Sequence, residues 1–423
     1  MTKIYFPYGR DFLEYDFPVS RFLGVIESSF CDYVPKYSEI ELVRGAICNP
    51  IGSAALSELS VGKGRVVLIA SDHTRPVPSK LIVPQLLGEI RRGNPQAEII
   101  ILVATGCHRC PTSVELAEKF GQEIFESEKI VVHDCDKSEF IDLGKLPSGG
   151  DLVLNRLAID ADLLISEGFI EPHFFAGFSG GRKSVLPGIA ARETVIYNHN
   201  ATFIADNFAR TGVLRRNPIH ADMIYAARKA KLAFICNVII NSKKEVIYAV
   251  AGDCDAAHAE GCDFLCKNCM ADAIPADIVV TSNGGYPLDQ NIYQAVKGMT
   301  AAEATVKKNG VIIMIAKSND GHGGCHFHKT FANEKNLNNM LKNFMETPNA
   351  KTQVDQWQSQ IFARVLKHAS VIYISEAPDN IVKDLHMIPA KSIKEALSIA
   401  ENILKNPNAT ITAIPDGVSV IVK

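Results

Sequence analysis

Short runs of apolar residues recur along the chain, and a polar turn and an amphipathic stretch follow each of them. The first clear run is RVVLIA at 65–70, and AEIIILVATG at 97–106 repeats the pattern. Continuous apolar runs of this length are typical of parallel strands that are buried on both faces. Similar runs follow at 129–133 and 162–166. The alternation predicts an α/β fold with mainly parallel sheets.

The alternation ends near residue 272 and restarts at 275. We therefore expect an N-terminal α/β domain over residues 1–272 and a smaller α/β domain over residues 275–400, with a tail at about 407–423 that packs back on the first domain. The elements expected in the smaller domain are strand 278–281, helix 289–307, strand 311–316, helix 352–368, strand 371–375 and helix 393–405.

Composition narrows the possible partners. The 423 residues are 47% apolar and 22% charged, which is typical of a globular protein, and a net charge of −3 gives no reason to expect nucleic acid or an anionic membrane as partner. The N-terminus has no basic flank before an apolar run, so we expect no signal peptide. The odd count of 11 cysteines favours reduced thiols and a cytoplasmic location.

Polar residues follow three of the predicted strands. SDHTRP at 71–76 comes after the first strand, CHRC at 107–110 after the second, and the fourth leads into a long polar segment. The carboxyl ends of parallel strands share one edge of a sheet, where open α/β sheets bind ligands. We therefore expect the three loops to converge, although Asp72 also has the alternative of capping a helix at 79–92.

The segment after the fourth strand carries the densest chemistry. Three glycines, a serine, an arginine and a lysine lie between Gly177 and Lys183, and His173 and His199 flank them. Glycine permits a close approach of another molecule. Ser179 and the loop N–H groups suit an anion, and Lys183 suits a point charge or a nucleophile. An ordinary glycine-rich surface loop remains the alternative.

Two familiar motifs nearly fit this segment. GFSGG at 177–181 matches a nucleophile elbow, but that motif needs its serine at the tip of a strand, and the predicted strand ends at 166. The stretch 177–184 resembles a phosphate loop, but Arg182 occupies the position that must be glycine. We expect neither motif to be present.

Three groups of cysteines and histidines have spacings like those of metal sites. They are Cys262, Cys266 and Cys269; Cys107 and Cys110; and His322, Cys325, His326 and His328. The first group falls on one face of a predicted helix, which favours packed thiols. The second has no matching pair, which argues against structural zinc. The third group follows a strand end, so binding of a soft or borderline metal remains open.

Several of these motifs together resemble the nickel-pincer lactate racemases. The matching stretches are SDHTRPVP at 71–78, ATGCHR at 104–109, residues 166–188, YNH at 197–199 and NGGYPLDQNIYQAVKGMT at 283–300. The similarity runs from about residue 50 to the C-terminus. The chain departs from the family at Cys107, at Cys110 and in the segment around Cys325.

The resemblance implies two α/β domains with the active site in the cleft between them. It also implies interconversion of D- and L-lactate by hydride abstraction and return, through a covalently attached nickel(II) pyridinium-3,5-bisthiocarboxylate mononucleotide. Lys183 matches the lysine that forms the cofactor thioamide, and His199 matches the nickel ligand. A square-planar Ni(II) with one imidazole suits that metal. Cofactor-synthesis and delivery proteins are the implied transient partners.

The remaining site residues also come from the resemblance. Matches to positions that contact the cofactor are Asp72, His73, Thr74 and Arg75; matches to substrate-binding positions are Arg75, Tyr293, Gln294 and Lys297; and matches to the acid/base pair are His108 and His173. The alternatives are a racemase of another 2-hydroxy acid, a nicotinamide-dependent dehydrogenase and a nickel or nucleotide carrier. The dehydrogenase would need a G-x-G-x-x-G after the first strand, which this chain lacks.

The chemistry agrees with these assignments. An α-proton leaves a 2-hydroxy acid with difficulty because the adjacent carboxylate disfavours a carbanion, whereas loss of hydride leaves a stable keto acid. A protein that catalyses this step must bind a carboxylate, for which Arg75 and Lys297 are suited. It must also take and return the hydroxyl proton, and imidazoles do so near neutral pH.

Overall fold

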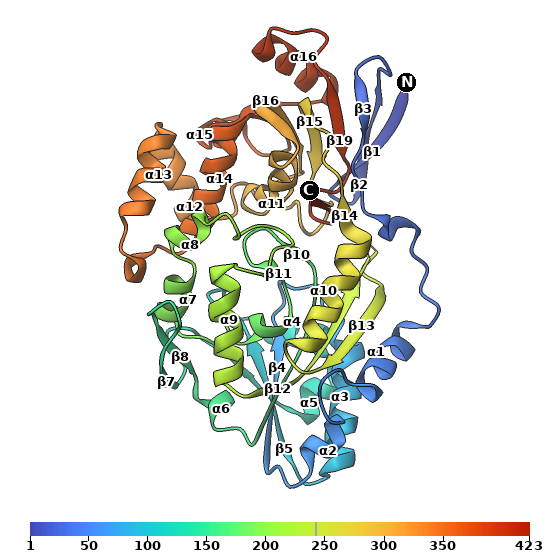
Figure 1. Ribbon diagram of the computed structural model, residues 1–423, viewed down its shortest axis with the longest axis vertical. Helices are drawn as coiled ribbons and strands as arrows, with labels where there is room; N and C mark the ends of the chain where they lie inside the picture. The colour runs from blue at the N-terminus through green and yellow to red at the C-terminus, as the bar shows by residue number, and fades with distance from the viewer. Residues whose placement is uncertain (242) are drawn as a thin grey trace. The chain divides into compact units, whose positions relative to one another are not determined.

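The computed structural model describes residues 1–241 and 243–423 and divides into two compact units. Unit 2 is Phe30–Lys267, and unit 1 joins Met1–Ser29 to Asn268–Lys423 (Figure 1). Both units alternate strands with helices, so the α/β prediction is confirmed.

The predicted domain boundaries differ from this division at both ends of the chain. Residues 1–29 were expected in the first domain but belong to unit 1, where Phe6 and Phe17 are buried in the core of its sheet. The C-terminal tail was expected to pack on the first domain, yet Ile411–Ile414 is a strand of the unit 1 sheet. Such short strands carry no local signal of the sheet that they join, because pairing is decided by residues far away in the sequence.

Unit 2 is built on a six-stranded sheet in the order β13-β12-β9-β4-β5-β6, in which only the β12–β13 pair is antiparallel. Its strands are β4 (Arg65–Ser71), β5 (Glu98–Ala104), β6 (Lys129–Val132), β9 (Leu163–Phe169), β12 (Leu232–Ile240) and β13 (Val246–Gly252). A separate hairpin joins β7 (Phe140–Lys145) to β8 (Asp151–Asn155), and β10 (Pro172–His173) pairs with β11 (Gly177–Phe178). The helices are α1 (Glu39–Cys48), α2 (Leu56–Ser60), α3 (Ser79–Gly93), α4 (Ser113–Phe120), α5 (Gln122–Ser127), α6 (Arg156–Ile159), α7 (Arg192–Asn198), α8 (Ala201–Ala205), α9 (Pro218–Lys229) and α10 (Ala256–Cys269).

The order of strands in unit 2 creates a switch point beside β4. The chain runs from β4 outward to β5 and β6, and then crosses to β9 on the other side of β4. The side chains of β4 from Val66 to Ala70 are fully buried, as the continuous apolar run predicted. Ligands of open α/β sheets bind outside the carboxyl ends of the strands at such a switch point.

Unit 1 contains an all-parallel sheet in the order β18-β17-β16-β15-β19-β3. Its strands are β3 (Phe22–Val25), β15 (Ala276–Ser282), β16 (Val306–Ile315), β17 (Ser370–Ile374), β18 (Ile388–Ala390) and β19 (Ile411–Ile414). Two smaller pairs are β1 (Thr2–Tyr8) with β2 (Asp11–Phe17), and β14 (Met270–Ala271) with β20 (Ile421–Val422).

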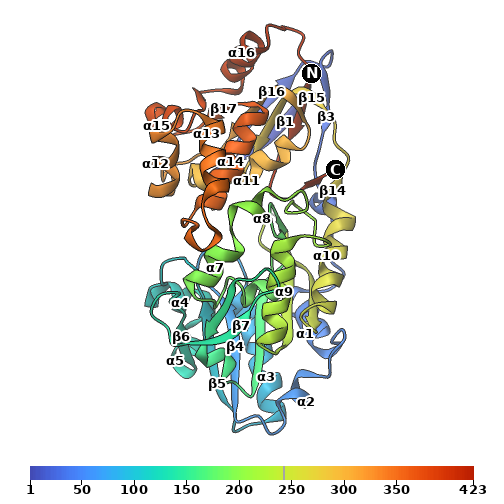
Figure 2. The same cartoon turned by 60° about the vertical axis from the view of Figure 1, so that its left-hand side comes forward.

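Two layers cover the unit 1 sheet. The β1–β2 hairpin and α16 share one apolar core with it, and α11 and α14 pack together against its central strands (Figure 2). The helices are α11 (Ile292–Glu303), α12 (Cys325–Asn333), α13 (Leu337–Glu346), α14 (Gln356–His368), α15 (Asp379–Asp384) and α16 (Ile393–Leu404). Among the described residues, none of the helices in either unit has the length and apolar character needed to span a bilayer.

Candidate functional site

The three polar loops leave neighbouring strands of the unit 2 sheet, as predicted. Asp72 follows β4, His108 follows β5, and the segment with Lys183 follows β9, and β4 pairs with both of the other strands. A backbone hydrogen bond of 3.0 Å from Gly106 N to Gly188 O ties the second loop to the third. The carboxyl edge of this sheet therefore collects the candidate residues of unit 2.

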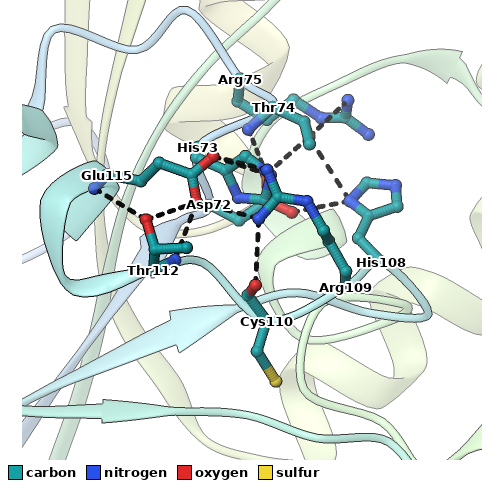
Figure 3. Close-up of polar contacts among 9 residues, drawn as sticks. All are labelled: Asp72, His73, Thr74, Arg75, His108, Arg109, Cys110, Thr112 and Glu115. Carbon is teal, nitrogen blue, oxygen red and sulfur yellow. Dashed lines mark hydrogen bonds and ion pairs between the residues drawn. The ribbon is translucent and has the colours of Figure 1, made fainter.

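Asp72 and His108 form the best-defined contact at this edge (Figure 3). His108 Nδ1 lies 2.7 Å from Asp72 Oδ2, and the other carboxylate oxygen accepts hydrogen bonds from the Thr74 N–H at 3.0 Å and the Thr74 hydroxyl at 2.6 Å. The Asp72 side chain is 1% exposed and the His108 side chain 43% exposed. A buried carboxylate thus holds one imidazole nitrogen and leaves the rest of the ring accessible.

The charges around Asp72 keep its carboxyl ionised. Burial on its own raises the pKa of Asp72, but the hydrogen bond and charge of His108, with Arg75 and Thr74, outweigh burial and hold that pKa well below its usual range. A carboxylate that accepts from Nδ1–H fixes the tautomer of the ring and leaves Nε2 to exchange a proton. The arrangement suits His108 for acid/base chemistry.

The rest of the first loop offers donors in the same turn. Arg75 Nη1 donates to the Thr74 hydroxyl at 3.3 Å, and no carboxylate of the described residues forms an ion pair with Arg75. The Nδ1 atom of His73 is buried and has no hydrogen-bond partner among those residues. Burial lowers the pKa of His73, so its ring favours the neutral form. A ligand with acidic oxygens would satisfy both side chains.

Lys183, His173 and His199 gather around a single aromatic ring, that of Phe175. Lys183 Nζ lies 5.8 Å from the centroid of this ring, the His173 ring centroid 4.5 Å and the His199 ring centroid 5.2 Å. His173 Nδ1 accepts a 3.3 Å hydrogen bond from the N–H of Ala176, so Nε2 is the ring nitrogen that this bond does not use. Three candidate residues spread over 27 positions of sequence thus share one neighbourhood.

The environment of His199 differs from that of His108. His199 is 5% exposed, and burial, followed by the positive charge of Lys183, lowers its pKa to about 3. Its imidazole is therefore neutral at physiological pH, which is the form that binds a metal ion.

Comparison with known proteins places these residues in context. A model of the lactate racemase N-terminal domain matches residues 8–212, and a model of the lactate racemase C-terminal domain matches residues 271–422. The chain belongs to the lactate racemase family. It is 51% identical to the lactate racemase of Thermoanaerobacterium thermosaccharolyticum and 50% identical to that of Lactiplantibacillus plantarum, over the full length of each chain.

Solved structures agree with this assignment. The lactate racemase apoprotein from T. thermosaccharolyticum superposes with a TM-score of 0.97 at 50% identity and covers both chains completely. A Thermotoga maritima protein at 19% identity has a TM-score of 0.64 over 92% of this chain and all of its own, and shares the fold alone. The protein is accordingly a racemase, an isomerase, as the sequence predicted.

The glycines of the racemase segment serve the fold itself. A Cβ on Gly180, at φ +73°, would come within 2.8 Å of Asn237 Oδ1, and a Cβ on Gly181, at φ +53°, within 2.8 Å of the His258 ring. Ser179 was expected to suit an anion, but its hydroxyl is buried between the Phe169 carbonyl at 3.0 Å and the Glu171 N–H at 2.8 Å. Protein atoms therefore already engage the Ser179 hydroxyl, and a side chain at Gly180 or Gly181 would collide with its neighbours.

The sequence did not predict the structural roles of two buried ionic residues beside the racemase site. Arg182 is fully buried and donates to Ala176 O at 2.8 Å and to His220 Nδ1 at 3.1 Å. Glu167 Oε1 accepts from the Ser71 N–H at 2.8 Å and thus anchors the loop that carries Asp72. Arg182 lies in the glycine-rich segment, but its partner His220 is 38 positions away, and the Ser71 partner of Glu167 is 96 positions away, so no local pattern predicts these roles.

The predicted substrate residues of unit 1 lie together on α11. Tyr293, Gln294 and Lys297 are all partly exposed, and the Tyr293 hydroxyl donates to Asp355 Oδ1 at 2.9 Å. The helix begins at Ile292, three residues later than expected, because Asn291 caps it through the Gln294 N–H. Their role in binding substrate, and the placement of the site in a cleft between two domains, stay predictions.

The structure shows the surroundings of two of the groups with metal-like spacing. Cys262, Cys266 and Cys269 lie on α10, where Cys262 and Cys269 are buried, in agreement with the prediction of packed thiols. In the third group, for which metal binding was left open, the His322 and His328 rings stack with their centroids 4.9 Å apart. His328 Nε2 lies 3.2 Å from Asp384 Oδ2. Over the described residues, only Asp134, Cys135 and Asp136 bring three potential metal-binding atoms within 4.8 Å of one another.

Proposed function

We propose that this racemase interconverts D- and L-lactate by removing hydride from C2 and returning it, with a nickel-pincer nucleotide bound to Lys183 and His199. The single observation that carries the proposal is the gathering of Lys183 and His199 around Phe175 in a chain half identical to two lactate racemases. The coenzyme would reach Lys183 through synthesis and delivery proteins that bind only transiently.

The residues present fit such a group. The imidazole of His199 is neutral because its pKa is lowered to about 3, so it offers a lone pair to nickel without first losing a proton. The buried Nδ1 of His73 offers a further polar contact. When bound, the pincer nucleotide would supply a cationic acceptor for hydride. The His199 imidazole would be a nitrogen ligand of a kind that nickel(II) accepts.

The chain's own residues have separate tasks in this proposal. Arg75 binds the substrate carboxylate, and its planar guanidinium matches the two carboxylate oxygens. His108, oriented by Asp72, removes or returns the hydroxyl proton through Nε2. His173 does the same from the other side, because the hydroxyl groups of the two enantiomers point in opposite directions. Tyr293, Gln294 and Lys297 complete the substrate contacts.

The test uses protein purified from its native host. The intact mass should exceed the sequence mass by one mononucleotide adduct, and the holoenzyme should convert pure D- or L-lactate to the racemic mixture. Lys183→Ala should lose both the adduct and activity, whereas the exposed Lys137→Ala should keep both. An adduct that persists in Lys183→Ala would contradict the attachment site.

The same preparation distinguishes the alternatives. Faster racemisation of malate or of a longer 2-hydroxy acid would change the substrate and leave the site intact. Formation of NADH from lactate and NAD⁺ would indicate a dehydrogenase. Stoichiometric nickel without any conversion of lactate or another 2-hydroxy acid would indicate a carrier.

A further inference from the structure

Two cysteines lie at equivalent positions after neighbouring strands of unit 2. Cys107 follows β5 and precedes His108, and Cys135 follows β6. The two strands pair up to Val103 and Val132, and beyond them the Thr105 hydroxyl donates to the His133 carbonyl at 2.6 Å. Each cysteine comes two residues after this bridge, so the backbone brings the two loops side by side at that point.

The two thiols are neighbours. Each is close enough to influence the ionisation of the other; Cys107 is partly exposed and Cys135 is 6% exposed. Arg192 approaches the pair, because its N–H donates to the Cys135 carbonyl at 3.1 Å. The hydrogen bond from Cys107, followed by the charge of Arg192, lowers the pKa of Cys135 despite its burial. Of the two thiols, Cys135 therefore ionises more readily, and the thiolate is the form that reacts with an oxidant.

A metal ion is a poor explanation for this cluster. Asp136 uses both carboxylate oxygens on Arg192, at 2.6 Å each, and Asp134 Oδ1 accepts the N–H groups of Asp136 and Lys137. A divalent cation would have to displace Arg192 or lie beside its positive charge. Both oxygens of Asp136 and one oxygen of Asp134 are thus already engaged.

We propose that Cys107 and Cys135 are a redox modification site that closes to a reversible disulfide. With a peroxide as oxidant, the Cys135 thiolate attacks one peroxide oxygen, the O–O bond breaks and hydroxide leaves, which makes a sulfenic acid on Cys135. The Cys107 sulfur then attacks Cys135 Sγ, the S–S bond forms and water leaves. In sum, two thiols and hydrogen peroxide give one disulfide and two waters.

Cys110 is the competing partner because it forms a C-x-x-C with Cys107. It is exposed, and Figure 3 shows its sulfur directed away from Asp72 and His108. Cys135 lies on the neighbouring loop, which the Thr105–His133 hydrogen bond holds beside the loop of Cys107, and a disulfide brings the two sulfurs to about 2.05 Å. The geometry therefore favours the pair that spans two strands over the pair within one loop.

Formation of the Cys107–Cys135 disulfide would displace His108, which is next to Cys107 in the sequence. His108 keeps its place through its bond to Asp72 and through a 2.9 Å turn from its N–H to the Thr105 carbonyl. Movement of Cys107 toward Cys135 displaces this turn, and a shift of about 1 Å at a catalytic group can lower a rate about 100-fold. We expect oxidation to lower racemisation by roughly tenfold or more. Only this activity readout rests on the proposed function.

The test treats the holoenzyme with hydrogen peroxide, removes the oxidant, alkylates the remaining thiols and maps the peptides by mass spectrometry. We expect one Cys107–Cys135 disulfide, a parallel loss of lactate racemisation, and recovery of both thiols and activity with dithiothreitol. Cys110→Ser should behave like the parent. Cys107→Ser and Cys135→Ser should form no such disulfide and lose less activity at the same peroxide dose.

Several outcomes would overturn the proposal. A Cys107–Cys110 disulfide, irreversible oxidation of either cysteine alone, or no disulfide at all would do so. An equal activity loss in the parent and in Cys135→Ser, with no recovery on reduction, would show damage elsewhere and remove the link to His108. If Cys135→Ser does not fold, Cys135→Ala and the peptide map of the parent decide the question. A mapped Cys107–Cys135 disulfide in a protein inactive on lactate would contradict the proposed function but not this site.

Discussion

His108 and His199 lie in the same unit of this racemase, but their surroundings are opposite. His108 is 43% exposed and contacts a buried carboxylate at 2.7 Å. His199 is 5% exposed, packs against Phe175 and has Lys183 as a positively charged neighbour, which together with burial lowers its pKa to about 3. The first environment holds one ring nitrogen on a carboxylate and leaves the ring accessible, and the second keeps the ring buried and neutral.

This difference suggests how the environment, more than the residue type, would divide the two proposed roles. A histidine that must gain and lose a proton needs a partner for the charged form and access to the substrate. A histidine that binds a metal needs a lone pair that protons do not occupy. The two surroundings thus support acid/base work at His108 and metal ligation at His199, and the following changes test that separation.

The largest effect is expected from removal of the carboxylate behind His108. Asp72→Asn and His108→Asn should each lower lactate racemisation by roughly 10²–10⁴-fold, because both remove the oriented base. The double variant should be no worse than the single ones, since the pair acts as a unit. Asp151→Asn removes only an exposed ion pair with Lys145 and is the control. Normal rates for Asp72→Asn in both directions would show that the contact is only structural.

The second effect concerns the pH dependence of stability. The pKa of His133 is lowered to about 4 and that of His199 to about 3, each mainly by burial. Below about pH 6.5 the unfolded chain protonates these rings while the fold keeps them neutral, so stability is lost as pH falls. Each histidine should lower the free energy of unfolding by about 1.4 kcal/mol per pH unit between 6.5 and about 4.

Urea unfolding of the apoprotein at a series of pH values measures this slope. His133→Asn should reduce the pH dependence of the free energy of unfolding by the contribution of one histidine. Asn is chosen because it is polar, as is the His133 ring that contacts Asn155 and the Ala190 carbonyl. A stability that does not change between pH 6.5 and 4.5 would contradict the neutral state of both rings.

The smallest effect is expected from a change at Arg109, the residue after His108. Arg109 forms an exposed ion pair with Glu115, and the Glu115 carboxylate also caps α4 by accepting the Thr112 N–H. Exposed ion pairs are screened by water, so Arg109→Gln should change racemisation by less than about twofold. A loss of racemisation as large as that of His108→Asn would show that Arg109 also takes part in catalysis. It would contradict the distinction between His108 and its neighbours in the loop.

The sequence predicted those features that local patterns control. The apolar run at β4 and the polar turn with Asp72 gave the strand, the loop and their place at the carboxyl edge. Residues whose partners lie far away in the chain were missed. Arg182 contacts His258, which is 76 positions later, and Phe17 joins the core of a sheet most of whose strands lie beyond residue 275. No local pattern contains such pairings, because the fold creates them.

Nickel content of three histidine variants tests the central assignment most directly. His108→Asn, His173→Asn and His199→Ala would be purified from a host that makes the cofactor, and nickel per chain would be measured by mass spectrometry of the digested protein. We predict that only His199→Ala loses nickel, while the other two keep about one nickel per chain and lose racemisation. Nickel retained by His199→Ala, or lost from His108→Asn, would contradict the separation of the two roles.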